Sequence, residues 1–126
     1  MTMAEHQDYL RLQRNVAVKL VINRIKNNPA SSVDELLKDI PYSKRHFSDL
    51  FKDVTGTTLQ LYRQRIRILT ARYLLTETDL KPEEICKKVG YTSVEAFTKV
   101  FRSHVGCSPL LYKDRVLTER GGDSII

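Results

Sequence analysis

Metal-binding and disulfide patterns are missing from this sequence. Its 126 residues include two cysteines, Cys86 and Cys107, which lie far apart, and no Cys/His group has the spacing of zinc ligands. A phosphate-binding glycine loop, a nucleophile elbow and a His-Glu-x-x-His motif are missing too. We therefore expect two reduced structural thiols, as in a reducing compartment, and a protein that holds no metal and no cofactor and is not an enzyme.

Long apolar runs are also missing. The most apolar segment, residues 16–22, is interrupted by Lys19, and it is far shorter than the about 20 residues of a membrane-spanning helix. Residues 1–15 mix acidic and basic side chains and contain no apolar segment of the kind found in secretory signals. These absences predict a soluble cytoplasmic protein with no membrane partner.

Positive charge is what the chain has in excess. Lys and Arg number 21 against 15 Asp and Glu, which gives a net charge of +6 and a pI of about 9.4. Such a balance suggests a polyanionic partner, which can be DNA, RNA or an acidic membrane surface. The length and the 41% of hydrophobic residues allow one ordinary domain, or two very small lobes that share a core.

Residues that start and end helices recur along the chain, and almost nothing has the pattern of a strand. Ser32 and Glu35 form a capping box, Ser43 is a good N-cap, and Gly56 and Gly106 are typical residues just past a helix end. The fold class is expected to be all-α with about seven helices. The predicted helices span residues 9–26, 33–39, 44–55, 59–76, 82–89, 94–105 and 109–117.

The sequence repeats itself at an offset of 50 residues. The matching residues are Ser43, Phe47, Phe51, Gly56, Leu61, Tyr62 and Arg65 in the first copy and Ser93, Phe97, Phe101, Gly106, Leu111, Tyr112 and Arg115 in the second. Upstream the offset is 49, so that the two turns differ by one residue. Because caps, glycines and aromatic residues all match, a plain helical bundle with coincidental Phe spacing is a poor explanation.

Each copy consists of a short helix, a tight turn and a second helix, which is the helix-turn-helix plan. The second helix of such a unit can enter the major groove, and one chain with two units can contact two groove segments about 34 Å apart without dimerising. We expect two helix-turn-helix lobes joined by a long linker helix. The expected parts are residues 1–56 (first helix and first helix-turn-helix), 57–77 (linker helix), 78–117 (second helix-turn-helix and C-terminal helix) and 118–126 (disordered tail).

The motif residues resemble those of the AraC/XylS family of bacterial transcription regulators over about residues 16–117. The linker-helix part of the motif is Arg67, Ala71, Leu74 and Leu75. The second-repeat part is Gly90-Tyr91, Phe97, Phe101-Arg102, Gly106, Ser108-Pro109 and Tyr112-Lys113. The departures from the family pattern are conservative: Tyr replaces Phe, Arg replaces Lys, Ser replaces Thr and Lys replaces Arg.

The chain is similar in size to stand-alone family members resembling the MarA/SoxS/Rob group. That resemblance implies binding to double-stranded DNA as a monomer, control by abundance rather than by an effector, and activation through contacts with RNA polymerase. It also implies a place in the cytoplasm at the nucleoid. The initial Met1 and the distinct first helix favour a complete protein over a fragment of a longer regulator.

The second helix of each unit would be its recognition helix, the helix that enters the major groove. In the first recognition helix, residues 44–55, the side chains expected to point inward are Phe47, Phe51 and Val54. The outward positions are Lys44, Arg45, Ser48, Asp49 and Lys52, of which Arg45, Ser48 and Asp49 match base-reading positions of the family. Arg45 can donate two hydrogen bonds to a guanine edge, and Asp49 can accept one from cytosine. The two residues are also four apart, so that they can instead pair on the helix surface. His46 can touch a phosphate.

In the second recognition helix the matching positions are Val94, Glu95, Ala96, Thr98 and Lys99. Val94 and Ala96 can pack on thymine methyl groups, and Lys99 can reach a guanine or a phosphate. Thr98 is adaptable. Thr92 or Ser93 caps this helix, and Glu95 has alternative roles: it can complete a capping box with Thr92, or it can pair with Lys99.

Other basic residues are expected to hold phosphates rather than to recognise bases. These candidates are Lys44, Lys52, Lys88 and Arg102. The helix starts at Thr57-Thr58 and Cys107-Ser108 can offer backbone N–H groups to phosphates. Arg63, Arg67 and Arg72 are expected in a solvated face or in structural pairs. With about six phosphate contacts, the logarithm of affinity should fall with that of salt concentration at a slope near −5.

Two other functions stay open. A similar fold occurs in DNA-repair proteins with a reactive or metal-bound cysteine, but Cys86 lies on an apolar helix face and Cys107 is isolated, which disfavours repair. The acids Asp49 and Glu95 motivate a second alternative. In it the chain is a regulator that acts by binding RNA polymerase or another protein and that recognises DNA poorly.

Overall fold

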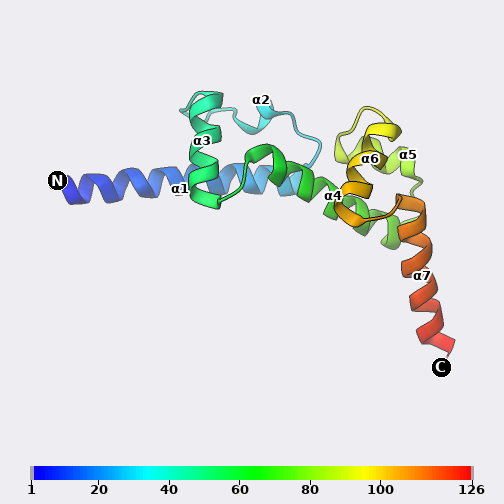
Figure 1. Ribbon diagram of the computed structural model, residues 1–126. Coiled ribbons are helices and arrows are strands. Elements are labelled where there is room, and N and C mark those ends of the chain that lie inside the picture. The colour runs from blue at the N-terminus through cyan, green and yellow to red at the C-terminus, as the bar shows by residue number, and fades with distance from the viewer. Residues whose placement is uncertain (1, 126) are drawn as a thin grey trace. The chain divides into compact units, whose positions relative to one another are not determined.

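The computed structural model describes residues 2–125, and within this range the regular structure is entirely helical (Figure 1). This confirms the predicted all-α class. The helices are α1 (Met3–Asn27), α2 (Val33–Leu36), α3 (Lys44–Thr55), α4 (Leu59–Glu77), α5 (Pro82–Val89), α6 (Val94–Val105) and α7 (Pro109–Ile125). Among the residues described, no helix is long and apolar enough to cross a membrane.

The chain divides into two compact units, Met1–Arg63 and Gln64–Ile126. The boundary falls inside α4, so the linker helix supplies its first residues to one unit and the remainder to the other. Each unit therefore contains one helix-turn-helix: α2 and α3 in the first, α5 and α6 in the second.

In the first unit, α3 packs against α1, and α1 also contacts α2. Phe47, Leu50 and Phe51 of α3 are buried, and the other buried residues of these helices are Ala17, Val18, Val21, Ile25 and Leu36. Tyr62 of α4 meets the Phe51 ring edge-on, with 5.6 Å between the ring centroids. Val54, which was expected to point inward, lies on the same face as Phe47 but in the last turn of α3, where it is 42% exposed.

The second unit has an equivalent core. Its buried cluster consists of Ile68, Ala71, Leu75, Ile85, Cys86, Val89, Phe97 and Phe101. Tyr112 of α7 meets Phe101 edge-on at 5.7 Å, which repeats the contact between Tyr62 and Phe51. The aromatic residues that recur in the sequence thus recur in packing, as a duplicated structural unit requires.

Most predicted helix ends are confirmed. The side chains of Ser32, Ser43 and Ser93 accept hydrogen bonds from backbone N–H groups three residues later. Gly56 and Gly106 take left-handed conformations, with φ of 78° and 95°, and each donates its N–H to the carbonyl four residues earlier at 2.8 Å. Helix α4 is capped by the Thr58 side chain, which accepts a hydrogen bond from the Leu61 N–H at 3.1 Å.

Three helix ends differ from prediction, two of them in the first unit and one in the C-terminal segment. Helix α1 begins at Met3 instead of about Tyr9, because the Thr2 side chain accepts a hydrogen bond from the Glu5 N–H at 3.2 Å. Helix α2 ends at Leu36, three residues before the left-handed Asp39, whose φ is 62°.

The C-terminal segment also differs from prediction, which had the chain disordered from residue 118. Helix α7 continues to Ile125, and Arg120 forms an ion pair with Glu77 of α4 at 2.7 Å between Nη2 and Oε1. A glycine within a helix costs only about 1 kcal/mol relative to alanine, so the Gly121-Gly122 pair need not end it. The last predicted tail residue, Ile126, lies outside the described residues.

Candidate nucleic-acid interface

The exposed side of α3 carries every contact residue that the sequence predicts for the first repeat. Lys44, Arg45, Ser48, Asp49 and Lys52 are all exposed. Arg45, Ser48, Asp49 and Lys52 lie on the side away from the buried Phe47 and Phe51, and Lys44 is exposed because it is the first residue of the helix. A polar, mainly basic helix surface is therefore available to a partner.

One of these residues already has a partner within the unit. Lys44 at the start of α3 forms an ion pair with Asp34 of α2. Both side chains are largely exposed, at 66% and 77%, and pairs of this kind contribute little to stability. Lys44 can therefore exchange Asp34 for a phosphate at little loss.

The acidic residues of the two recognition helices remain unpaired in the described part of the chain. Asp49 does not pair with Arg45, and Glu95 does not pair with Lys99, although both spacings allow it. Ser93, not Thr92, accepts the capping hydrogen bond of α6, so a capping box between Thr92 and Glu95 does not form. Both carboxylates are thus free to meet a partner.

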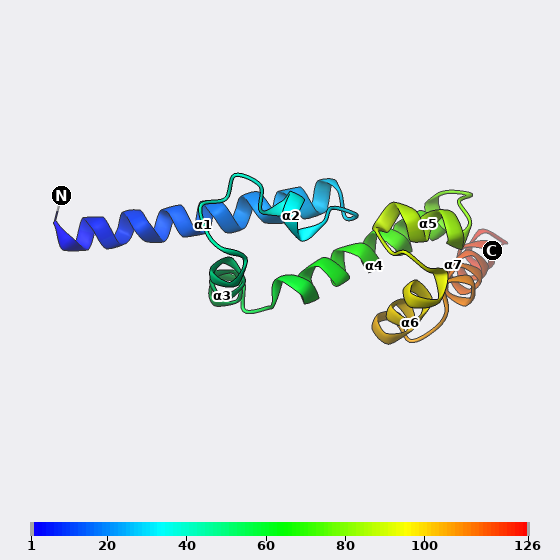
Figure 2. The ribbon, with the colours of Figure 1, turned by 90° about the horizontal axis from the view of Figure 1, so that it is seen from above.

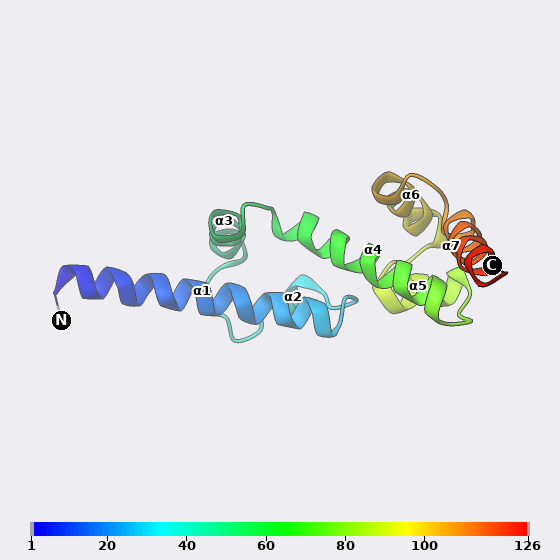
Figure 3. The same cartoon turned by 90° about the horizontal axis from the view of Figure 1, so that it is seen from below.

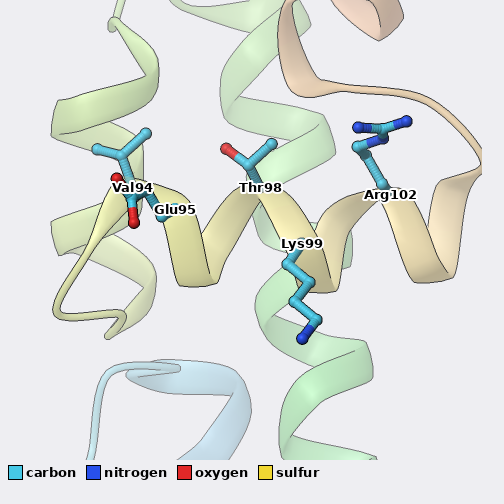
Figure 4. Close-up of a pocket in the computed structure, with 5 residues that line it drawn as sticks. All are labelled: Val94, Glu95, Thr98, Lys99 and Arg102. Atoms are coloured by element: carbon cyan, nitrogen blue, oxygen red, sulfur yellow. The ribbon is translucent and has the colours of Figure 1, made fainter.

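The predicted residues of the second repeat lie together on α6. Figure 4 shows a shallow groove that is lined by Val94, Glu95, Thr98, Lys99 and Arg102. Val94, Thr98 and Arg102 follow one another at one-turn intervals and point to the same side, whereas Lys99 points away from them. The sixth predicted residue, Ala96, is exposed on the same helix.

A second groove occurs in equivalent places of both units. In each it lies beside the middle of the recognition helix and the start of the helix that follows. The first is lined by Val33, Ser48, Leu59, Gln60 and Arg63, and the second by Lys81, Pro82, Glu83, Val94, Thr98, Ser108, Pro109 and Leu110. Two of these lining residues, Gln60 and Lys81, are not among the contact residues predicted from the sequence; Gln60 takes the place of Leu110 in the repeat.

The first residues of α4 and α7 offer fewer free backbone N–H groups to a phosphate than the sequence predicts. Thr58 and Ser108 use their side-chain oxygens as caps, accepting from Leu61 and Leu111 at 3.1 and 3.2 Å. The N–H of Thr57 donates to the Thr55 hydroxyl at 3.3 Å, so it is not directed at an outside ligand. The backbone N–H groups of the first turns of α4 and α7 therefore remain the groups best placed for a phosphate.

Arg63, Arg67 and Arg72 of the linker helix were expected either on a solvated face or in structural pairs, and the structure shows them in contacts within the chain. Arg63 donates to the Ser31 carbonyl at 2.8 Å. The guanidinium of Arg67 lies 5.3 Å from the Tyr91 ring centroid, and that of Arg72 lies 5.3 Å from the Tyr112 centroid. By contrast, Lys52, Lys88 and Arg102 are exposed without such contacts in residues 2–125, which suits them to solvent or phosphate.

His46 and Cys86 each contact a neighbouring residue, and Cys107 is a partly exposed free thiol. His46 packs edge-on against Tyr42 at 5.1 Å while staying exposed. Cys86 is buried, its Sγ donates to the Tyr91 carbonyl at 3.4 Å, and desolvation raises its thiol pKa more than the nearby Lys87 charge lowers it. In the described range, no group of His, Cys, Asp or Glu side chains could hold a metal ion.

Comparison with known proteins identifies the same domain. A family described as "Helix-turn-helix domain" matches residues 36–115, more than half of the chain. The "Probable transcription factor PqrA" of Proteus vulgaris is 29% identical over 79% of this chain and 82% of its own length. The "RCS-specific HTH-type transcriptional activator RclR" of Escherichia coli (strain K12) is 33% identical over 69% of this chain. This chain spans only 31% of RclR.

A solved structure supports the fold. The DNA-binding domain of AdpA, a global transcriptional factor in complex with a target DNA, aligns with a TM-score of 0.75 and 24% identity, over 82% of this chain and 96% of that domain. At that identity the likeness concerns the fold alone, and it agrees with the duplicated helix-turn-helix. Together with the matched family and its named relatives, these features show that the chain belongs to the AraC-type family of helix-turn-helix regulators of transcription, which bind DNA and are not enzymes.

Proposed function

We propose that this chain activates transcription by inserting α3 and α6 into successive major-groove segments of one double-stranded DNA site. The observation that carries the proposal is the exposed face of α6. On it, five of the six residues predicted from the sequence line one groove opposite the buried phenylalanines. The names of RclR and other relatives as activators support the direction of regulation.

Both recognition helices would contact base edges in the major groove. In α3, Arg45, Ser48 and Asp49 face the bases, with Arg45 suited to guanine and Asp49 to cytosine. In α6, Val94 and Ala96 meet thymine methyl groups. The remaining base-contact candidates of α6 are Glu95, Thr98 and Lys99.

Phosphate contacts would position the two helices on the duplex. Lys44, Lys52, Lys88 and Arg102 supply exposed positive charge. The first turns of α4 and α7, which follow the capping residues Thr58 and Ser108, would supply backbone N–H groups beside the repeated grooves. Most of the salt dependence of binding would come from these contacts, with a slope near −5 on logarithmic axes for about six phosphates.

One copy would suffice for each DNA site, because both recognition helices belong to the same chain. Activation would then depend on a contact with RNA polymerase at the promoter, and the protein would act in the cytoplasm at the nucleoid, where its target lies. These partners rest on the family resemblance and on the activator names of the relatives.

Selection from a random-sequence duplex pool tests the proposal. The purified chain is mixed with the pool, bound duplexes are recovered over several rounds, and the recovered DNA is sequenced. We expect an asymmetric motif of two boxes about one helical turn apart, bound by one chain. Adding the enriched site to an in vitro transcription reaction with RNA polymerase should then raise the transcript yield.

Failure to enrich any motif would overturn the DNA-recognition proposal. Weak binding that is sensitive to salt and indifferent to sequence would favour the second candidate, a regulator that acts through a protein partner. The exposed, unpaired carboxylates of Asp49 and Glu95 are the observation in its favour, because acids next to phosphates repel them.

A further inference from the structure

The N-terminal half of α1 carries an apolar stripe that the rest of its unit leaves largely exposed. No residue from Met3 to Val16 is buried, and Figures 2 and 3 show this part of α1 extending beyond α2 and α3. Tyr9, Leu12, Val16 and Leu20 are nevertheless exposed by 50%, 60%, 57% and 42%. Their spacing of three and four residues places them on one face of the helix.

This stripe is distinct from the face of α1 that packs in the core. The buried residues of α1 are Ala17, Val18, Val21 and Ile25. At about 100° per residue, their centre lies roughly 150° around the helix from the centre of the exposed stripe. A helix that is apolar on two nearly opposite sides is suited to neighbours on both, and the other helices of this unit, α2 and α3, pack with α1 while the stripe keeps about half of its side-chain surface exposed.

The stripe continues into a groove of the first unit. Leu12, Val16 and Leu20 line it on one side, and Ile40, Pro41 and Tyr42 of the turn before α3 line it on the other. Such a groove accepts a protruding apolar or aromatic side chain. Tyr9 is the one aromatic residue of the stripe, and its hydroxyl accepts a hydrogen bond from the Gln13 side chain at 2.9 Å, which orients the ring.

Charges beside the stripe favour a second copy of this chain in antiparallel orientation. Asp8 and Lys19 lie on the same edge of the stripe, and a twofold antiparallel pair brings identical edges together. In such a pair the two chains run in opposite directions, so the numbers of two facing residues add to nearly the same value along the whole contact. If Leu12 faces Val16 of the second copy, then Asp8 faces Lys19 and Tyr9 faces Leu20. The twofold symmetry makes each of these contacts occur twice.

A parallel pair has no such complementarity. Each stripe residue would face its own copy, and the charged residue Asp8 would lie near Gln13 rather than near a cation. The antiparallel register also places Tyr9 of one copy at the groove beside Leu20 of the other. The geometry and the charges thus select one arrangement.

We propose that two copies of this chain associate through an antiparallel pairing of their α1 helices along Tyr9, Leu12, Val16 and Leu20. This contact is separate from DNA recognition, in which one chain occupies one site. It would join two chains that are bound to neighbouring sites. Four partly exposed side chains form a small interface, so the pairing is weak and transient.

Helix stability is consistent with this pairing. A helical stretch of this length without tertiary packing is marginal in water. Covering the stripe would stabilise the N-terminal half of α1, so helix content and association should rise together with protein concentration.

Sedimentation equilibrium with the full chain tests the proposal. We expect the apparent mass to rise from 14.6 kDa toward twice that value with increasing concentration, and the helical circular dichroism signal to rise in parallel. Leu12→Glu places a charge at the centre of the stripe and should keep the chain monomeric. The control Leu69→Glu, at an equally exposed position of α4, should associate like the wild type.

Charge reversal tests the register. Asp8→Lys and Lys19→Asp should each associate less than wild type, because each puts like charges opposite one another across the pair. An equimolar mixture of the two variants restores both attractions in a mixed pair and should associate again, at low salt more than at high salt.

Either of two results would overturn the proposal. One is a wild-type mass that stays at the monomer value up to about 1 mM, which would leave the stripe to a different protein. The other is a mixture of the charge variants that associates no better than each variant alone. Neither result bears on DNA selection by one chain, so the two proposals fail separately.

Discussion

The two helix-turn-helix units share their aromatic packing but differ in how their turns are made. In the second, Gly90 ends α5 with a φ of 98° and donates its N–H to the Lys87 carbonyl at 3.2 Å. In the first, the corresponding turn has Asp39 at a φ of 62°. Here the carbonyls of Leu36 and Lys38 accept hydrogen bonds from the Arg24 side chain of α1, at 2.9 and 2.7 Å.

That difference shows two solutions to the same geometric problem. A helix that ends leaves unsatisfied carbonyl groups, and a tight turn needs a backbone that a side chain disfavours. The second unit solves both with one glycine. The first unit accepts a non-glycine residue in the left-handed region and adds a side chain from a helix outside the motif. Helix α1 is therefore part of the first turn through the hydrogen bonds of Arg24, whereas α4 meets the second turn through Arg67, whose guanidinium lies over the Tyr91 ring.

The largest expected effect concerns the buried phenylalanine–tyrosine contact that both units share. Phe51→Ala and Phe101→Ala each remove a fully buried ring and its contact with a tyrosine, and each should lower the free energy of unfolding by about 3–5 kcal/mol. Urea denaturation measures both losses, and amide hydrogen exchange reports which unit opens. Tyr73→Ala, at an exposed position, is the control and should change stability by less than about 0.5 kcal/mol.

The next effect tests whether the two recognition helices contribute alike to DNA affinity. Arg45→Ala and Lys99→Ala should each weaken binding to the selected site by about 1–3 kcal/mol and relax the preference at one base pair. Fluorescence anisotropy with single-base variants of the site measures both. Lys26→Ala, at the end of α1, should leave the base preference unchanged. An unchanged affinity for both variants would remove them from the proposed interface.

Asp49→Ala belongs to the same comparison, and the sign of its effect distinguishes the two proposed functions. If Asp49 accepts from a cytosine, its removal weakens binding to the selected site. If the carboxylate only repels phosphates, affinity rises for every sequence tested, and the variant loses no specificity. The same anisotropy titration distinguishes the two outcomes.

A smaller effect should separate the two turns. Arg24→Met keeps much of the side-chain volume but removes both hydrogen bonds to the first turn, and we expect a loss of about 1–2 kcal/mol, since the Leu36 carbonyl is partly buried. Thermal unfolding measures the loss. Amide exchange should rise in α2 and α3 and stay unchanged in α5 and α6. A uniform change across both units would contradict a local role for Arg24.

The smallest effect reverses the difference between the turns. Asp39→Gly relieves a positive φ that costs a non-glycine residue roughly 1 kcal/mol, and the greater freedom of glycine in the unfolded chain offsets part of this gain. We expect a net stabilisation of about 0.5 kcal/mol in thermal unfolding. Gly90→Ala should destabilise the chain, because its φ of 98° is unfavourable for any side chain. A loss of stability for Asp39→Gly would show that the Asp39 side chain holds the turn.

Much of the fold could be predicted because its signals are local. The bounds of α3 and α6 follow from serine caps and glycine ends that lie within four residues of the backbone groups they satisfy. The exposed contact residues follow as well, since the Phe47–Phe51 and Phe97–Phe101 pairs determine which side of each helix faces out. Because the unit is duplicated, the serine cap, the glycine and the phenylalanine pair each occur twice, and each copy supports the prediction for the other.

Other features depended on residues distant in the sequence, and the local pattern carried no sign of them. Arg120 meets Glu77 across 43 positions, which accompanies the extension of α7 beyond its predicted end. Arg72 meets Tyr112 across 40 positions, at 3.2 Å, so a residue that could have faced solvent is in a pair.

By itself, then, the sequence determined the helical class, the duplicated helix-turn-helix and the exposed faces of the two recognition helices. Periodicity, caps and glycine stops act over a few residues, and they specify a helix and its buried side before any other element is placed. The tertiary structure alone decided how the first turn is held by Arg24, how Lys44 pairs with Asp34, and that the stripe on α1 stays largely exposed within its unit. Those outcomes depend on which distant groups come within bonding distance, and only the packed chain fixes that distance.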